Sequence, residues 1–521
     1  MRYLHAALRK FKKPFGLSDC EAELEILRDG YQQFYFHESP FSKAALKENT
    51  YLIVGRRGSG KTALSQYFSF QREVKNPICI EVANPQVYQQ VLTTLAERTA
   101  SSQVIAIPHL ARVWEYVIWS TVFHELRDQN LGLSAPCDIP VDRAANVSEV
   151  IRTLFESLTG LFETDNELSI GKSIDTMMND TQLKERIRSV KRFAHDHPIF
   201  IAIDTLEQYD VRDEHLMTAM SALVQFAAQF NLQYADDRIH LKVFMSGEAF
   251  PRLKAAALLN PLKHSRDPLY LLWRPKELLR LIGWRFWRFL LEADPEHYGD
   301  LTNVRWTSHK EVIERLWEPF FGRELVNSNG LQERTFAYIL RHTQMRPRQL
   351  IYICNEIASA ALESEQFPNF PPELLRAGLK KAESELATEI VNSYRLTYPN
   401  VDRIIDALMG MPKVFIGTDL DKRARETKSE WRRDAYSLSN FRQLVTELGI
   451  VGRVSKKNEE AGFIDADFEY SSTERITIMP RDECVIHPMF YARLNVQLDQ
   501  KVRVMPFSVE RGEVAELQGL W

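Results

Sequence analysis

The sequence predicts an α/β fold with a parallel β-sheet core, a helical lid and a C-terminal winged-helix domain. Three observations carry this prediction. A short apolar run at 51–54 leads into a glycine-rich loop and then into a helix-forming segment. The run at 197–204 is dominated by isoleucine and phenylalanine, as in a central parallel strand covered by helices on both faces. From about residue 266 helical spacing replaces the buried strands, and strand-like runs return only near residue 449.

Residues 55–62 fit the pattern G-x-x-x-x-G-K-[ST] of a phosphate-binding loop. A strand before such a loop and a helix after it direct backbone N–H groups and a helix N-terminus at an anion. Lys61 is predicted to reach the outer phosphates, and the Thr62 hydroxyl to bind Mg²⁺. The alternative, a glycine-rich turn with a chance lysine, does not account for both flanks. The predicted cradle consists of Gly55, Arg57, Gly58, Ser59, Gly60, Lys61, Thr62 and Ala63.

Acidic residues follow the apolar run at 197–204. Asp204 ends this predicted strand, and the carboxyl ends of parallel strands border the crevice where ligands bind. Asp204 is therefore predicted to hold Mg²⁺ through water, and Glu207 to polarise the attacking water. The alternatives are a helix cap or turn residue for Asp204 and a solvated acid for Glu207. Ser246 and Glu248, after the next predicted strand, are further candidates for sensing a terminal phosphate.

Two arginines flank a proline in the helical region. Pro347 suits the first position of a helix, which places Arg346 and Arg348 at a helix start. Arg348 is predicted to border the cleft between lid and core, to contact a γ-phosphate and to report its hydrolysis. The alternative is a pair of surface arginines.

Three short helical segments, followed by strands at 449–454 and 474–479, predict the winged-helix domain. Within it, the stretch 422–433 carries six basic and two acidic residues. This stretch could contact DNA phosphates, although a charge-mixed, solvated helix is the favoured interpretation. His487 is interpreted first as a structural histidine.

The predicted segments follow one another along the chain. They are an N-terminal helical segment at 1–50, a nucleotide-binding core at 51–265 with a helical insertion at about 86–197, a helical lid at 266–366, a linker helix at 367–400, the winged-helix domain at 401–495 and a tail at 496–521. Phe15 in the first segment could form a wall near a nucleotide base or could pack on the core.

Length and composition set broad bounds. The chain has 521 residues, of which 45% are hydrophobic and 26% charged, as expected for a globular protein of several domains. The net charge of −4 gives no global sign of nucleic-acid binding, although a local basic face is compatible with it. Five widely spaced cysteines without a C-x-x-C pair favour reduced thiols. Such thiols suit a cytosol, so a cytoplasmic protein is expected. No run approaches the length of a membrane span.

Taken in order, these motifs resemble the STAND and origin-recognition-complex-like branch of AAA+ P-loop ATPases, in particular its bacterial standalone members. The resemblance covers roughly residues 15 to 495 and depends most on the glycine-rich loop. It implies that binding or hydrolysis of ATP, with Mg²⁺, drives a conformational or assembly switch. It also implies a separately encoded effector or partner protein, a possible homo-oligomer and a role in anti-phage defence.

One departure affects the assignment of the water-polarising acid. Thr205 follows Asp204 where many AAA+ members have the catalytic Glu, and this favours Glu207. Two other functions stay open at this point. One is an ATP-regulated DNA-binding protein that acts through its winged helix. The other is a signalling scaffold that binds ATP or ADP with little turnover, in which His487 could reach the phosphates.

Overall fold

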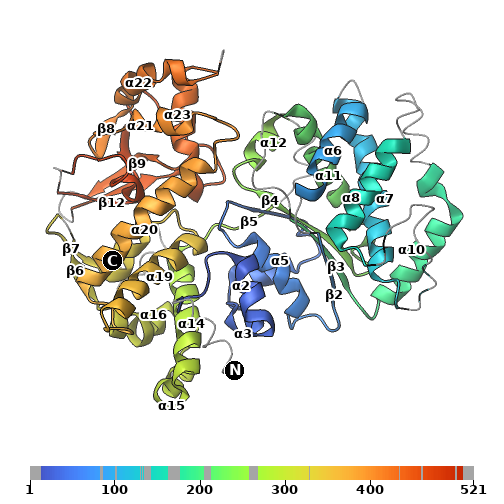
Figure 1. Cartoon of the computed structure of the whole chain (residues 1–521), viewed down its shortest axis with the longest axis horizontal. Coiled ribbons are helices and arrows are strands. Elements are labelled where there is room, and N and C mark those ends of the chain that lie inside the picture. Colours follow the sequence, from blue (N-terminus) through green and yellow to red (C-terminus); the bar gives the residue numbers. More distant parts are fainter. Residues whose placement is uncertain are drawn as a thin grey trace. The chain divides into compact units, whose positions relative to one another are not determined.

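The computed structural model of the chain describes residues 13–82, 86–99, 103–129, 144–161, 176–204, 213–256, 268–327, 329–432, 435–458, 462–498 and 501–507, with the single positions 131, 133 and 142. The chain divides into two compact units, whose elements are labelled in Figure 1. The parallel-sheet unit consists of Pro40–Arg57 and Lys61–Leu271. The C-terminal unit consists of Met1–Ser39, Gly58–Gly60 and Leu272–Trp521.

In the described residues, the parallel-sheet unit has five strands that all run parallel, in the order β2-β3-β4-β1-β5. The predicted α/β class with a parallel sheet is confirmed. The apolar runs in β3 and β4 are buried, and only Asp204, at the end of β3, is half-buried. The strands are β1 (Leu52–Gly55), β2 (Ile78–Val82), β3 (Ile199–Asp204), β4 (Ile239–Ser246) and β5 (Leu269–Tyr270).

Helices cover both faces of this sheet (Figure 1), which explains why most residues of its central strands are apolar. One face shares a large apolar core with α11 and with the helices that lie between β2 and β3 in the chain. On the other face, Phe68 of α5 stacks on Phe200 of β3 with ring centroids 5.4 Å apart. The helices are α4 (Pro40–Ala45), α5 (Lys61–Phe70), α6 (Gln86–Thr99), α7 (Gln103–Glu125), α8 (Val147–Leu161), α10 (Thr181–Ala194), α11 (Glu214–Tyr234) and α12 (Phe250–Ala256).

A buried lysine ties β4 to the turn that leads into β1. Lys242 is 0% exposed, and its ammonium donates to the carbonyl oxygens of Lys47 at 2.7 Å and Thr50 at 2.8 Å. Burial lowers the pKa of Lys242 from 10.5 to about 7. His240 lies two residues earlier on the same face of β4, and burial lowers its pKa to about 4. The start of β1 is therefore anchored by two hydrogen bonds from a lysine that is removed from water.

The C-terminal unit is mainly helical up to residue 392. The first elements of the C-terminal unit are α2 (Cys20–Leu27), η1 (Arg28–Gly30), α3 (Tyr31–Phe34), α14 (Pro275–Ala293), α15 (Pro295–Tyr298), η3 (Gly299–Asn303), α16 (His309–Val312), η4 (Ile313–Trp317), α17 (Glu318–Phe321), the hairpin β6 (Glu324–Val326) and β7 (Gln332–Arg334), α18 (Thr335–Leu340), α19 (Pro347–Glu363) and α20 (Pro372–Asn392). No helix in the described part of the chain is long and apolar enough to cross a membrane.

The segment before α2 belongs to the core of this helical region. Phe15 is 1% exposed and stacks on Phe286 of α14 with ring centroids 4.8 Å apart. Arg285 donates to Glu23 at 2.9 and 2.8 Å and to the Phe15 carbonyl at 3.1 Å. Of the two interpretations of Phe15, packing on the core is therefore confirmed, and a wall near a base is wrong because the ring is enclosed.

Helices α19 and α20 pack closely where a glycine faces the neighbouring backbone. A Cβ atom on Gly378 of α20 would lie 2.6 Å from the Cα of Ile357 in α19. Contacts shorter than 3.0 Å require backbone movement, so the absence of a side chain permits this close approach.

A mixed sheet in the order β12-β10-β9-β11-β8 follows α20, and helices from the same stretch of chain accompany it (Figure 1). Strand β11 pairs antiparallel with both β8 and β9, and β9 pairs antiparallel with β10. The elements are α21 (Val401–Asp406), β8 (Val414–Ile416), α22 (Gly417–Glu426), η5 (Lys428–Glu430), α23 (Leu438–Glu447), β9 (Val451–Asn458), β10 (Phe463–Asp467), η6 (Glu469–Ser471), β11 (Glu483–Ile486), η7 (Pro488–Phe490) and β12 (Arg503–Met505).

One strand predicted in this region is wrong. The strand expected at 449–454 corresponds to β9, but 474–479 is not a strand, and β10 and β11 pair with β9 instead. Side chains bind several backbone groups of 474–479. The Ile476 N–H donates to the Glu469 carboxylate at 3.3 Å, and the Ile478 carbonyl accepts from Arg442 at 3.0 Å. An alternating apolar pattern indicates an extended chain but does not specify its hydrogen-bond partner.

We expect Gly378→Ala to destabilise the protein by about 1–3 kcal/mol, because the added methyl group overpacks the contact between α19 and α20. Gly160→Ala in α8 is the matched control, since a Cβ there meets no heavy atom within 4 Å among the described residues. It should stabilise the helix by about 0.5–1 kcal/mol. Urea unfolding of both variants measures the difference, and an equal effect would contradict the close packing.

We expect the free energy of unfolding to rise with pH between about pH 7 and 10.5, the folded and unfolded pKa values of Lys242. Because the folded-state pKa is the lower one, the unfolded chain binds more protons in this window. Lys242→Met should remove this component of the pH dependence, whereas Lys254→Met, at an exposed position of α12, should leave it. Denaturation at pH 7 and at pH 10.5 measures the free energy of unfolding at both ends of the window. If this free energy rises with pH in Lys242→Met as steeply as in the unaltered chain, the prediction is refuted.

Candidate functional site

The glycine-rich loop, residues 55–62, runs from the last residue of β1 into the first turn of α5. Gly58 has φ +78° and Gly60 has φ +97°, in the left-handed region that other residues rarely adopt. A Cβ on Gly60 would meet no heavy atom within 4 Å among the described residues. At Gly60 the loop therefore presents bare backbone to open space, as a cradle for a ligand requires.

Lys61 and Thr62 begin α5. Lys61 is 3% exposed, and its ammonium donates to the Gly55 carbonyl oxygen at 3.0 Å, so the side chain folds back across the loop. The Thr62 hydroxyl donates to Oδ2 of Asp204 at 3.1 Å. Ala63 lies in the same first turn. The predicted metal-binding pair, Thr62 and Asp204, is thus brought into direct contact from β3 and α5.

An acid from the end of β4 contacts the same loop. Glu248 accepts a hydrogen bond from the Arg57 N–H at 3.1 Å and another from the Ser246 hydroxyl at 2.8 Å. Ser246 is paired in register with Gly55, so the turn after β4 meets the start of the loop. Glu248 therefore accepts the hydrogen bond of one backbone N–H group of the loop. A role for Ser246 or Glu248 in sensing a phosphate stays a prediction.

The middle of the loop, Gly58–Gly60, belongs to the C-terminal unit. The Arg348 backbone N–H, in the first turn of α19, donates to the Gly58 carbonyl at 3.3 Å. The Trp273 indole N–H donates to the Ser59 carbonyl at 2.8 Å. Ser59 itself is 4% exposed. Sequence reasoning missed Trp273, because a single aromatic residue before a helix carries no pattern.

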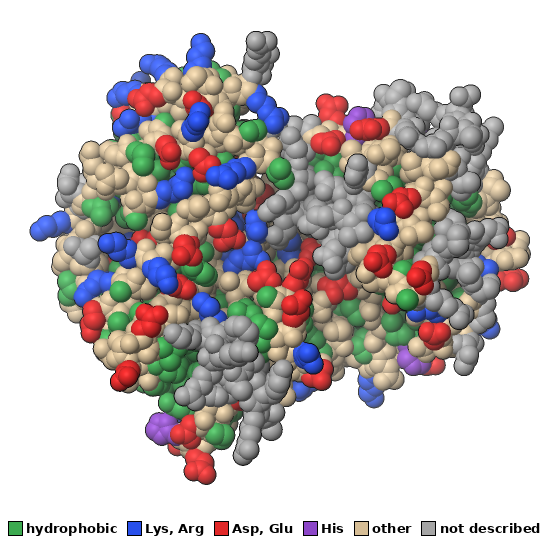
Figure 2. Space-filling model, in the orientation of Figure 1, with side chains coloured by type: hydrophobic (Ala, Val, Ile, Leu, Met, Phe, Trp, Pro, Cys, Tyr) green, Lys and Arg blue, Asp and Glu red, His purple; other side chains and the backbone are tan. Residues whose placement is uncertain are grey.

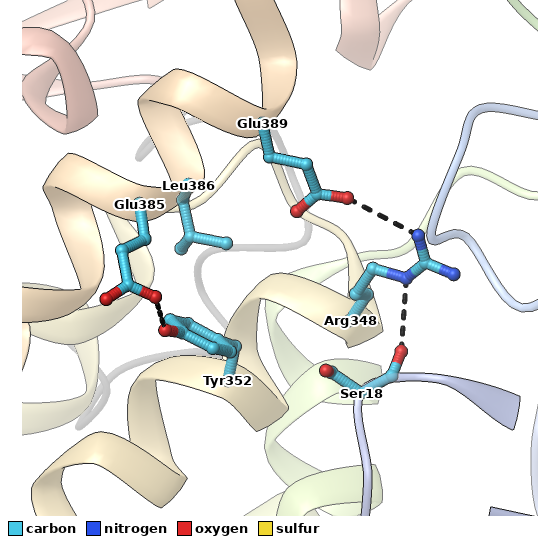
Figure 3. A pocket seen from close by; sticks show the side chains of 6 residues that line it. All are labelled: Ser18, Arg348, Tyr352, Glu385, Leu386 and Glu389. Atoms are coloured by element: carbon cyan, nitrogen blue, oxygen red, sulfur yellow. Dashed lines mark hydrogen bonds and ion pairs between the residues drawn. The ribbon is translucent and has the colours of Figure 1, made fainter. Parts of the chain in front are cut away.

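The position of Arg348 at a helix start agrees with the structure, since Pro347 is the first residue of α19 and Arg346 its N-cap. The Arg348 side chain donates to the Ser18 carbonyl at 3.1 Å and forms ion pairs with Glu389 at 3.4 Å and Asp19 at 3.6 Å. Figure 3 shows the contacts with Ser18 and Glu389. All of these partners belong to the C-terminal unit. Contact with a phosphate stays a prediction for Arg348.

A small cavity adjoins this arginine (Figure 3). Its volume is about 190 Å³. A hydrogen bond between Tyr352 and Glu385 closes one side of it. The lining residues are Ser18, Arg348, Tyr352, Glu385, Leu386 and Glu389. Its single arginine is already paired with an acid, so the cavity offers no free charge to an anion.

Glu207, the predicted water-polarising residue, lies outside the described residues. Its role stays a prediction. Asp204 is the last residue of β3, and its carboxylate contacts the end of the loop through the Thr62 hydroxyl.

His487 is a structural residue. It is 0% exposed, its Nδ1 accepts from the Met489 N–H at 3.1 Å, and its Nε2 lies 2.8 Å from the Tyr470 hydroxyl. Since Nδ1 accepts, Nε2 carries the proton and donates to Tyr470. Burial lowers the pKa of His487 well below 6.5, which keeps the ring neutral. Both ring nitrogens are occupied inside the C-terminal unit, as the structural interpretation requires.

The basic stretch at 422–433 is partly neutralised. Within α22, Lys422 pairs with Asp419 at 2.7 Å and Arg423 pairs with Glu426 at 3.4 Å. Arg433 lies outside the described residues. Figure 2 shows acidic side chains among the basic ones over this part of the C-terminal unit. The mixture of charges fits a solvated surface, but the predicted helix is wrong beyond Glu426, where α22 ends and only the short turn η5 follows. Binding of DNA stays a prediction.

Comparison with protein families gives a match over part of the chain. Residues 303–385 match the family model described as a FunZ-associated C-terminal helical domain. A comparison with curated proteins and one with solved structures gave no match. The matched stretch runs from the end of η3 into α20, within the C-terminal unit. The chain is thus similar to this family over a helical stretch that overlaps most of the predicted lid.

Proposed function

We propose that this chain is a P-loop ATPase of the AAA+ and STAND-like type, and that its nucleotide state controls assembly or the engagement of a partner protein. The contact between Thr62 and Asp204 is the observation that carries this proposal. Two unrelated sequence patterns predicted these residues, 142 positions apart, as ligands of one Mg²⁺ ion, and their oxygens lie 3.1 Å apart. A chance glycine-rich turn does not account for that juxtaposition.

The residues present fit a nucleotide with Mg²⁺. A hydroxyl and a carboxylate are the oxygen ligands that Mg²⁺ takes from protein side chains, with water and phosphate completing its shell. Bound there, Mg²⁺ would neutralise charge on the phosphates. Lys61 is poised at the loop and can exchange its bond to the Gly55 carbonyl for a phosphate oxygen. The open side at Gly60 leaves room for backbone N–H groups to bind an anion.

Phosphoryl transfer depends mainly on positioning and charge neutralisation, and these residues are suited to both. Asp204 and Thr62 would place the metal-binding oxygens, and Lys61 would supply positive charge. Glu207 is proposed to orient water, and Arg348 to relate the γ-phosphate to the helical segment. The hydrogen bond of Arg348 with Ser18 and its ion pairs with Asp19 and Glu389 would then have to exchange for phosphate contacts.

The mixed sheet supports the winged-helix part of the proposal. In chain order, α21, β8, α22 and α23 come first, and β9, β10 and β11 follow. Strand β11 lies between β8 and β9, and these four strands pair antiparallel, so a helix-rich start is followed by antiparallel strands. We propose that such a domain transmits the nucleotide state. The resemblance to AAA+ and STAND ATPases implies a separately encoded effector in anti-phage defence, which would supply the output. Both remain proposals for this chain.

We expect Lys61→Ala to weaken ATP binding about tenfold to a hundredfold, because the loss of one charge-assisted hydrogen bond costs a binding free energy of that order. Calorimetric titration with ATP and with ADP measures the effect. Lys254→Ala, at an exposed position of α12, is the matched control and should bind ATP and ADP as the unaltered chain does. Equal affinities for Lys61→Ala and the control would exclude this loop as the nucleotide site.

We expect Asp204→Asn to lower ATP turnover by about a hundredfold or more, because a metal ligand contributes several kcal/mol to charge neutralisation. The asparagine side chain can still accept from Thr62, so folding should be preserved. Asp196→Asn, an exposed acid in the same unit, serves as control. Release of phosphate at several Mg²⁺ concentrations tests the idea, and full turnover in Asp204→Asn would rule out its metal role.

A further inference from the structure

We propose that Trp273 is a positioning residue of the glycine-rich loop, and that it acts together with the first turn of α19. The two together hold the loop peptides in the one orientation that offers N–H groups to phosphate. This inference depends on the proposed function and deepens it, because it assigns a control of nucleotide affinity to the C-terminal unit.

The argument begins with two carbonyl oxygens. The Ser59 carbonyl accepts from the Trp273 indole at 2.8 Å, and the Gly58 carbonyl accepts from the Arg348 backbone N–H at 3.3 Å. In a planar trans peptide the N–H points away from the C=O of the same unit. The N–H groups of Ser59 and Gly60 therefore point away from Trp273 and α19.

This orientation is not intrinsic to the loop. Both Gly58 and Gly60 have positive φ, and glycine gives the adjoining peptide planes freedom to rotate. A rotated plane would direct a carbonyl oxygen at the anion and would replace attraction by repulsion. External donors to the two carbonyls favour the productive orientation before any ligand binds, which lowers the cost of binding.

Both donors are themselves held firmly. Trp273 precedes the N-cap of α14, where the Arg274 N–H donates to the Glu277 carboxylate at 3.0 Å and Pro275 starts the helix. The Arg348 N–H belongs to the first turn of α19, which Pro347 starts. The Arg348 stem also lies against Gly58, since a Cβ on Gly58 would be 2.8 Å from Cβ of Arg348. Two helix starts therefore fix the middle of the loop.

The decisive experiment compares Trp273→Phe, which keeps an aromatic ring but removes the N–H, with Trp273→His, which retains a ring N–H. We expect Trp273→Phe to bind ATP and ADP about tenfold more weakly, as for one lost hydrogen bond, and Trp273→His to recover part of this loss. Trp431→Phe is the matched control, because its indole bond to Thr427 lies in the mixed-sheet region.

Thermal unfolding separates positioning from a general structural role. Without nucleotide, Trp273→Phe should melt close to the Trp431→Phe control, and the stabilisation added by ATP should be smaller. Equal loss of affinity in Trp273→Phe and Trp273→His, or a loss explained by lower stability without nucleotide, would overturn the inference. Lys61→Ala is measured in parallel. If it weakens binding and Trp273→Phe does not, only the positioning role fails, whereas unchanged binding in Lys61→Ala removes the proposed function itself.

Discussion

The parallel register of β1, β4 and β3 is the constraint on which the candidate site depends. Gly55 at the end of β1 pairs with Ser246 of β4, and Asp204 at the end of β3 pairs with Phe244 of β4. Three strand ends therefore reach the same edge of the sheet. The glycine-rich loop, the turn with Glu248 and the Asp204 carboxylate all leave from that edge, and only this alignment lets the Thr62 hydroxyl meet Asp204.

The C-terminal unit is organised by buried ion pairs as well as by apolar packing. Arg285 and Glu23 join α14 to α2, and Arg341 and Glu333 join α18 to the β6–β7 hairpin, each through two hydrogen bonds. Removing one partner of such a pair leaves an uncompensated buried charge, which is strongly destabilising. The segment around Phe15 is thereby part of the unit that also holds the middle of the glycine-rich loop. A local loop motif thus depends on distant chain segments.

Prediction from the sequence succeeded where the local pattern and the tertiary role coincide. The run ending at Asp204 is apolar because both faces of β3 are covered, and Pro347 marks a helix start because its missing N–H costs nothing there. It failed at 474–479, where an extended chain bonds to side chains instead of a strand. It also could not foresee Trp273, because a hydrogen bond to Ser59, 214 positions away, leaves no periodic signal.

By itself, the sequence determined the α/β class, the glycine-rich loop and the acid at the end of β3, since burial and backbone freedom restrict residue type locally. The tertiary structure alone decided that Thr62 contacts Asp204, that Arg348 is paired inside the C-terminal unit, and that two donors from that unit hold the loop carbonyls. These are pairings between distant segments. Many partners are chemically equivalent for a hydroxyl, a guanidinium or a carbonyl, and only packing selects one of them.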